Sequence, residues 1–492
     1  MSGSKPDNKI AAYIAAGKIL AMIAQFAMPV FLTHYLSTEN YGIYNKFYTA
    51  FLTFGIIAGF GFQSNLYYFF PHSKKEERGS LVWNNLIVMS LLGFLGSLFF
   101  VIPQLRHVIL GDGPIDSYWQ IIALCIALYV PTNLTNTLAV VNKDKKLACF
   151  YPPADMIAKI AIIIPTALIF NTMSAILWGV TALQLMEWIF IWCYVKRGFG
   201  RAKWKDTINL PLLKQQLQYA LPFGGAVLLN TICQRFDKII CISYLSASEY
   251  AIYSLAFFGI PGIMQVYDAI VQVNVTNMAS AQAENDRPLL LSLYNKFIVK
   301  VLSFSLPIIA IVFLFAPQFI EFVFSTKYAA SIPYFRIYIL TFIIAMFGCG
   351  TILRAIGKTG LSFRAYLLSS VIYVPLCIFL IRHYGIQGAI ISAVIGICSP
   401  RLFQMFFEKK ALGCSFLTLI PCKDISKIAA ISIGLLIPAI FLDYFIHLNF
   451  WFAGGITVIY LLCVYIIEIR QNIFILEKET VINRFSRLRK FF

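Results

Sequence analysis

The chain has 492 residues, of which 59% are hydrophobic and 13% charged, with a mean hydropathy of +0.76 and a formal net charge of +18. Soluble domains carry about 25% charged residues and about 45–50% apolar residues, so this composition excludes an ordinary soluble fold. Apolar runs of about 18 residues or more recur along the chain, which is the length that a bilayer-spanning helix needs. The sequence therefore predicts an all-α polytopic membrane protein.

Fourteen membrane-spanning helices are predicted from these runs. In chain order they cover residues 10–33, 47–70, 81–103, 118–141, 153–170, 175–195, 217–243, 251–282, 298–316, 333–356, 365–381, 387–407, 428–446 and 451–469. With a cytoplasmic N-terminus, the inner loops and the tail hold 29 Lys and Arg residues, and the outer loops hold only Lys46, Arg106, Lys327 and Arg382. This asymmetry satisfies the positive-inside rule and predicts that both termini are cytoplasmic. It also accounts for most of the basic charge without a nucleic-acid partner.

One short phrase occurs twice. HYLSTENYGIY at residues 34–44 and SYLSASEYAIY at residues 243–253 agree at six of eleven positions with an offset of 209 residues, and Gln25 and Gln234 match in the same register. Both copies are predicted to form an outer turn where polar residues break two helices. Six helices separate the copies, and an even number preserves orientation, so the lobes are parallel repeats.

The repeat divides the chain into five predicted parts. They are a first lobe at 1–195, a basic cytoplasmic linker at 196–216, a second lobe at 217–407, two further helices at 408–469 and a basic cytoplasmic tail at 470–492. Two parallel six-helix lobes that rock about a central cavity are the plan of a transporter. A duplicated scaffold without transport is the alternative that the repeat leaves open.

Two stretches carry a resemblance to a known family. GKILAMIAQFAMPVFLTHYLSTENYGIYNKFYT and RFDKIICISYLSASEYAIYSLA resemble Wzx-type polysaccharide-unit flippases of the multidrug/oligosaccharidyl-lipid/polysaccharide (MOP) exporter superfamily. The resemblance implies a MATE/MOP-like fold that moves an undecaprenyl-pyrophosphate-linked oligosaccharide, such as an O-antigen repeat unit, to the outer leaflet of a bacterial inner membrane. It implies alternating access driven by an H⁺ or Na⁺ gradient, and a polysaccharide polymerase and a chain-length regulator as partners.

With Lys300 counted among the inner loops, seven basic and six acidic residues lie within the predicted helices. An ionisable side chain there costs about 2.5–3.5 kcal/mol on insertion scales, so it needs a partner or a wet cavity. The candidate substrate-binding residues are Lys18, Arg235, Asp237, Lys238 and Asp268. No catalytic residue and no metal ligand is predicted, because the eleven cysteines form no CxxC and no Cys/His cluster.

Each candidate has two interpretations. Lys18 has no acidic neighbour one helical turn away, so it either faces a cavity that holds the pyrophosphate or extends to the interface. Arg235 and Lys238 share a helix face and suit phosphate oxygens, or they extend outwards, while Asp237 points about 100° away from Lys238. Asp268 either pairs with Lys18 or Lys238, or binds the coupling ion.

The remaining charges suggest local pairs. Asp155 and Lys159 are four residues apart and favour a salt bridge on one helix, while Glu187 and Arg401 occupy comparable places in the two lobes. The helix-embedded charge is net basic, which favours an anionic head group over the cationic cargo of a MATE-type small-molecule exporter. A membrane polymerase or ligase would need a large outer loop with catalytic residues, so the short outer loops indicate a protein that is not an enzyme.

Overall fold

The computed structural model describes residues 26–200, 210–260, 263–471 and 473. Among these residues every regular element is a helix. In the described ranges nine helices are long and apolar enough to span a membrane, and Thr38–Gly59 with Phe62–His72 pass the same test as a pair that is bent by 49°. The predicted all-α membrane fold is confirmed.

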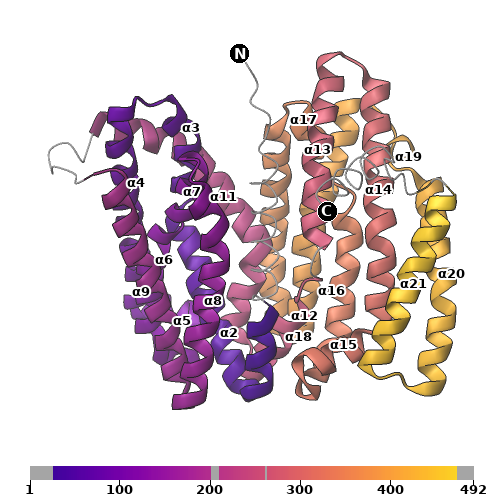
Figure 1. The fold of residues 1–492 in the computed structure, drawn as a ribbon, viewed down its shortest axis with the longest axis horizontal. Helices are drawn as coiled ribbons and strands as arrows, with labels where there is room; N and C mark the ends of the chain where they lie inside the picture. The colour runs from indigo at the N-terminus through magenta and orange to yellow at the C-terminus, as the bar shows by residue number, and fades with distance from the viewer. Residues whose placement is uncertain (1–25, 201–209, 261–262, 472, 474–492) are drawn as a thin grey trace, which may run out of the picture. The chain divides into compact units, whose positions relative to one another are not determined.

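The helices group into two compact units. The first comprises residues 1–254 and 373–393. It contains α2 (Thr38–Gly59), η1 (Phe62–Ser64), α3 (Asn65–His72), α4 (Lys75–Val101), α5 (Pro103–Leu110), η2 (Pro114–Tyr118), α6 (Trp119–Thr132), α7 (Leu134–Val141), α8 (Lys145–Phe170), α9 (Met173–Gly198), α11 (Leu210–Tyr244) and most of α12 (Ala247–Ala256). In this unit α6 packs against α2, α4 and α9, as Figure 1 shows in indigo and purple.

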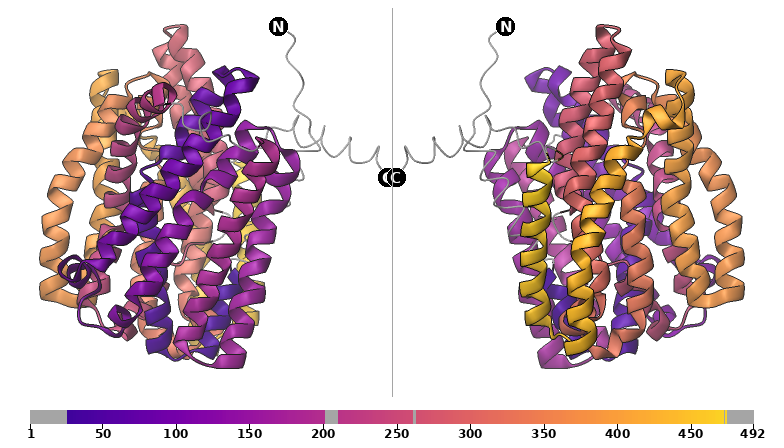
Figure 2. Two further views of the ribbon diagram at one scale, coloured as in Figure 1. Left: turned by 90° about the vertical axis from the view of Figure 1, so that its left-hand side faces the viewer. Right: turned by 90° about the vertical axis from the view of Figure 1, so that its right-hand side faces the viewer.

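The second unit comprises residues 255–372 and 394–492. It contains α13 (Ile263–Ala283), α14 (Arg287–Leu314), α15 (Ala316–Phe324), η3 (Thr326–Ser331), α16 (Ile332–Ala345), α17 (Thr351–Ala355), both ends of α18 (Thr359–Leu412), α19 (Phe416–Leu419), α20 (Cys422–Ile446) and α21 (Phe450–Arg470). Here α14 packs against α13, α16, α20 and α21, and the yellow helices α20 and α21 lie side by side in Figure 2.

Most predicted spans have a counterpart in the described part of the chain, although several are broken along their length. The span 251–282 is divided into α12 and α13, and 333–356 into α16 and α17. The two spans 365–381 and 387–407 are the two arms of α18, which turns at Gly385 with φ 54° and ψ −129°. The hydroxyl groups of Ser369 and Ser399 hydrogen-bond to each other across these arms.

The predicted start of the second span was wrong. It was placed at residue 47, whereas α2 begins at Thr38, because the Ser37 hydroxyl accepts a hydrogen bond from the backbone N–H of Asn40 at 3.2 Å. The polar residues that indicated a loop are therefore the N-cap and first turn of a helix. As a consequence Lys46, predicted for an outer loop, lies inside α2 and is buried.

Helix α11 is hydrogen-bonded to the N-terminal helices. It begins at Leu210, inside the segment 196–216 that was predicted as a linker. Gln216 is buried and donates a hydrogen bond to Oδ1 of Asn65 at 3.0 Å, and Asn65 in turn exchanges hydrogen bonds with Asn85. The two compact units are defined by contacts between residues, whereas the predicted lobes were defined by the sequence repeat. The two divisions answer different questions, so the lobe boundaries stay a prediction.

Candidate functional site

Both copies of the repeated phrase form the same helix break. The chain bends at Leu36 and Leu245, and the following serines cap the next helix. Ser246 accepts from the N–H of Glu249 at 3.2 Å, and the Glu249 carboxylate accepts the N–H of Ser246 at 2.9 Å, which completes a capping box. The outer turn predicted from the phrase is therefore a helix break whose cap is repeated in register.

Lys46 links the two copies within the first unit. Its ammonium group donates to the carbonyl oxygen of Ile242 at 2.8 Å and also to that of Leu245, and it lies 5.8 Å from the centre of the Tyr250 ring. The last carbonyls of a helix have no partner within that helix, and a cation there is favourable. Since its ammonium group is bound by protein carbonyls, Lys46 holds α2 against the end of α11.

Asp237 is the buried centre of a polar cluster on α11. Its side chain is 3% exposed, and its carboxylate accepts a hydrogen bond from the Tyr253 hydroxyl on α12. Its backbone N–H donates to the Tyr373 hydroxyl on α18 at 3.1 Å. The carboxylate also interacts electrostatically with Lys238. Asp237 therefore joins three helix segments of the first unit.

Arg235 differs from its neighbours. It is half-buried on α11, about 14 Å from the helix end at 1.5 Å per residue, and among the residues that the structure describes it has no ion pair or hydrogen bond. Lys238 lies close enough to interact electrostatically with it. The structure thus brings Arg235, Asp237 and Lys238 together and leaves the Arg235 guanidinium available to a ligand.

Of the two other candidates, the structure describes Asp268. Asp268 is exposed on α13 in the second unit, and no ion pair is found for it over the described ranges. Lys18 lies outside the described residues. The proposed pairing of Asp268 with Lys18 or Lys238 remains a prediction.

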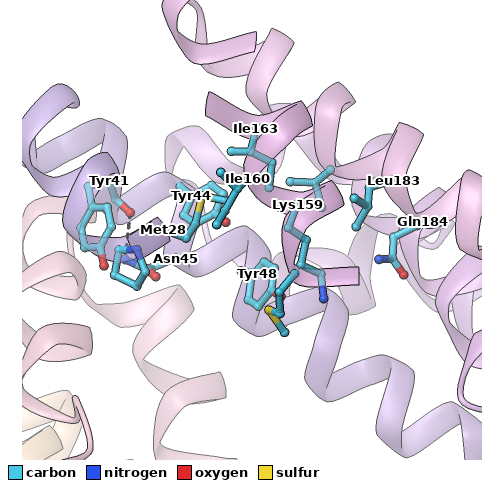
Figure 3. A pocket seen from close by; sticks show the side chains of 13 residues that line it. Met28, Tyr41, Tyr44, Asn45, Tyr48, Lys159, Ile160, Ile163, Leu183 and Gln184 are labelled. Atoms are coloured by element: carbon cyan, nitrogen blue, oxygen red, sulfur yellow. Dashed lines mark hydrogen bonds between the residues drawn. The ribbon is translucent and has the colours of Figure 1, made fainter. Parts of the chain in front are cut away.

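A second buried site lies among α2, α8 and α9 (Figure 3). The cavity has a volume of about 180 Å³ and is lined by Met28, Pro29, Tyr41, Tyr44, Asn45, Tyr48, Met156, Lys159, Ile160, Ile163, Val180, Leu183 and Gln184. Ligand pockets for whole small molecules usually measure about 300–1,000 Å³. This cavity therefore has room for a small group or a few water molecules.

The cation in this cavity is neutralised. Lys159 Nζ forms a salt bridge with Oδ2 of Asp155 at 2.8 Å, which confirms the predicted local pair. Glu187 on α9 interacts electrostatically with both residues, and its Oε1 is buried without a hydrogen-bond partner. Because two carboxylates face one ammonium group, this site does not favour an anionic ligand.

A family model described as "polysaccharide biosynthesis protein" matches residues 9–273, more than half of the chain. The chain belongs to the polysaccharide biosynthesis protein family. This membership confirms the resemblance to MOP-superfamily polysaccharide flippases that the two sequence stretches carry. Among curated protein sequences no match is found.

Solved structures of transporters share the fold of this family member. The inward-closed lipid II flippase MurJ superposes with a TM-score of 0.73 at 15% identity, covering 94% of this chain and 99% of that one. An inward-facing multidrug-resistance MATE transporter of the MOP superfamily superposes with a TM-score of 0.62 at 16% identity, and the match covers 80% of this chain and 94% of that one. A MOP transporter from Pyrococcus furiosus superposes with a TM-score of 0.53 at 16% identity, and the match covers 82% of this chain and 96% of that one. That transporter is described as having a binding pocket of reversed polarity. The predicted MATE/MOP-like fold is confirmed.

Sequence reasoning missed three residues that hydrogen-bond within and beside the candidate site of this family member. Tyr253 and Tyr373 hold Asp237, and Lys46 holds the end of α11. The repeat itself contained a signal for Tyr253, because the offset of 209 aligns Tyr253 with Tyr44 and Asp237 with Met28. A carboxylate in one copy where the other has an apolar residue indicates a position that was changed after duplication.

Proposed function

We propose that this protein is a flippase that translocates an undecaprenyl-pyrophosphate-linked oligosaccharide, an O-antigen or other surface-polysaccharide repeat unit, from the inner to the outer leaflet. It works by alternating access in a bacterial inner membrane with both termini in the cytoplasm. Family membership and the MOP fold support transport of a lipid-linked glycan. The observation that carries the proposal is the half-buried Arg235 guanidinium, which no described residue neutralises.

Arg235 has the chemistry that a diphosphate needs. A guanidinium donates two parallel hydrogen bonds to phosphate oxygens and keeps its charge at any physiological pH. A cation within a membrane-spanning helix is costly unless a ligand or water surrounds it. Lys238, three residues on, adds a second positive charge, whereas the cavity of Figure 3 is small and its lysine is already paired.

The roles that we propose for the other charged residues follow from the charge of their side chains. Lys18, in the first helix predicted from the sequence, receives the pyrophosphate from the inner side, and Asp268 carries the coupling H⁺ or Na⁺. Asp237 positions the helices that present Arg235, since Tyr253 occupies its carboxylate. A polysaccharide polymerase and a chain-length regulator receive the product at the outer face.

Reconstitution into liposomes tests the proposal. A fluorescent undecaprenyl-diphosphate oligosaccharide is placed in the inner leaflet, and its appearance outside is followed with a membrane-impermeant quencher. Wild-type protein is expected to accelerate this transfer, Arg235→Ala to slow it at least about tenfold, and Arg235→Lys to retain part of the rate, because an ammonium keeps the charge but not the fork. The matched control is Arg364→Ala, since Arg364 is an exposed arginine that forms no ion pair in the described part of the chain.

The outcomes separate the candidate functions. Wild-type protein that leaves the lipid-linked glycan in place but exports a cationic dye would favour a MATE-type exporter and refute the flippase. Equal rates for wild-type and Arg235→Ala protein would refute the assignment of Arg235 while leaving the flippase intact.

A further inference from the structure

A large polar cavity in the second unit lies outside all the sites above. Its volume is about 820 Å³, and it lies where the end of α13, the start of α14, the start of α20 and the end of α21 meet. Its lining residues are Val273, Asn274, Asn277, Pro288, Leu291, Ser292, Leu293, Asn295, Lys296, Phe297, Val299, Lys300, Asp424, Lys427, Gln471 and Ile473. In the proposed topology these helix ends are cytoplasmic.

The cavity is strongly basic. Lys296, Lys300 and Lys427 line it together with one carboxylate, Asp424, which leaves a net charge of +2. None of the three lysines forms an ion pair with another residue in the described ranges. All three lysines are exposed, and since like charges at one site repel each other, an anion placed among them is attracted by all three ammonium groups.

Helix orientation adds to this preference. The cavity is lined by the first turns of α14, which begins at Arg287, and of α20, which begins at Cys422. The N-terminus of a helix carries about half a positive charge, which favours an anion near the first turn. Pro288 of α14 and Asp424 of α20 place both helix ends in the wall of the cavity that the three lysines also line.

Asn295 supplies a second, different contact. Its Nδ2 donates to the carbonyl oxygen of Thr418 at 3.3 Å, which fixes the orientation of the amide. Its Oδ1 is buried and has no hydrogen-bond partner in the structure. A buried acceptor without a donor is costly, so this oxygen suits a ligand that carries a hydroxyl group.

The position next to lipid identifies the class of ligand. Only 22% of the most apolar window of α20 and 17% of that of α21 is buried inside the protein, so most of the surface of these helices faces the bilayer. The lining also includes apolar side chains such as Leu293 and Val299. Basic cavities between membrane helices on the cytoplasmic side suit the head groups of anionic lipids.

We propose that this cavity binds the head group of an anionic glycerophospholipid from the cytoplasmic leaflet. The phosphate lies among Lys296, Lys300 and Lys427, and a head-group hydroxyl donates to Oδ1 of Asn295. A volume of about 820 Å³ accommodates a head group and the adjoining glycerol. The bound lipid holds α20 and α21 to α14 and is distinct from the lipid that the protein carries.

Native mass spectrometry of the full-length, delipidated protein tests the proposal, with phosphatidylglycerol as the probe and phosphatidylcholine as the neutral comparison. Wild-type protein is expected to bind phosphatidylglycerol more tightly than phosphatidylcholine. In the triple variant Lys296→Gln/Lys300→Gln/Lys427→Gln the affinity for phosphatidylglycerol is expected to fall about 100-fold, because each lysine contributes about fivefold. The control is Lys196→Gln/Lys358→Gln/Lys410→Gln, which removes three exposed lysines outside the cavity and is expected to bind as wild type does.

A single variant tests the hydroxyl contact without changing the charge. Asn295→Leu is expected to weaken phosphatidylglycerol about fivefold and to leave phosphatidic acid, which has no head-group hydroxyl besides its phosphate, unchanged. Equal weakening of both lipids would overturn the role of Asn295.

Two results would overturn the site itself. One is phosphatidylglycerol binding that is as tight in the cavity triple as in the control triple. The other is a triple variant that loses undecaprenyl diphosphate but keeps phosphatidylglycerol, because the cavity would then serve the carried lipid. Binding is measured here without transport, so a failure of the proposed flippase leaves this test intact.

Discussion

The two copies of the repeated phrase have the same backbone but different chemistry. In both, a bend at leucine precedes a serine that caps the next helix. In the first copy Tyr44 and Met28 line the mainly apolar cavity that also contains Lys159 (Figure 3). In the second copy, at the same offset, Tyr253 hydrogen-bonds to the buried carboxylate of Asp237.

This difference shows how a duplicated transporter fold becomes asymmetric. The repeat conserves helix breaks and caps, whereas charged residues have been placed in only one copy at each position. In the alignment of the two copies, Asp237 is aligned with Met28, Arg235 with Phe26 and Lys46 with Leu255. The scaffold is therefore shared, and the candidate substrate contacts Arg235 and Lys238 lie in the second copy.

Replacing Lys46 should have the largest effect on stability. Lys46→Leu introduces the residue that the second copy has at the aligned position, Leu255, and keeps an apolar side chain there. It leaves two carbonyl groups at the end of α11 without their hydrogen-bond donor. Each unsatisfied buried group costs about 1–3 kcal/mol, so we expect a loss of about 2–4 kcal/mol. Thermal unfolding in detergent, compared with the exposed Lys423→Leu, measures it. Equal melting temperatures for both variants would show that water molecules hydrogen-bond to these carbonyl groups in place of Lys46.

A methyl group at Gly42 should have the next largest effect. A Cβ there would lie 1.7 Å from the carbonyl oxygen of Ala247, so the backbone of α2 or α12 has to move. Overpacking of this kind costs about 1–3 kcal/mol. The aligned position in the second copy holds a fully buried alanine, Ala251. We therefore expect Gly42→Ala to lower the melting temperature more than Ala251→Gly, and the reverse order would contradict the close approach.

The sequence predicted the class of fold and the repeat but not the partners of its charged residues. Apolar runs and loop charges are local properties of the chain, and they were sufficient to place nearly every described span. The Asp155–Lys159 pair was also local, four residues apart on one helix. In contrast, Lys46 meets carbonyls 196 and 199 residues away, and Asp237 meets Tyr373 136 residues away. Such contacts depend on how helices pack, which one sequence without its fold does not reveal.

Removing the Tyr253 hydroxyl tests the chemical asymmetry directly. Tyr253→Phe takes away the donor to Asp237, and we expect a loss of about 1–2 kcal/mol. Tyr44→Phe is the matched change in the first copy and should have almost no effect. A double-mutant cycle with Asp237→Asn isolates the pair, and additive losses would mean that the two side chains do not depend on each other.

The smallest expected difference concerns the caps themselves. Ser37→Ala and Ser246→Ala each remove an N-cap, which costs about 1 kcal/mol. In the second copy Glu249 also accepts the N–H and the hydroxyl of Ser246, while the first copy has Asn40 at that position. Asn40→Glu should therefore complete a capping box in the first copy and raise the melting temperature slightly, and only when Ser37 is present. A gain that persists in Ser37→Ala would instead reflect the attraction of a carboxylate to the N-terminus of α2.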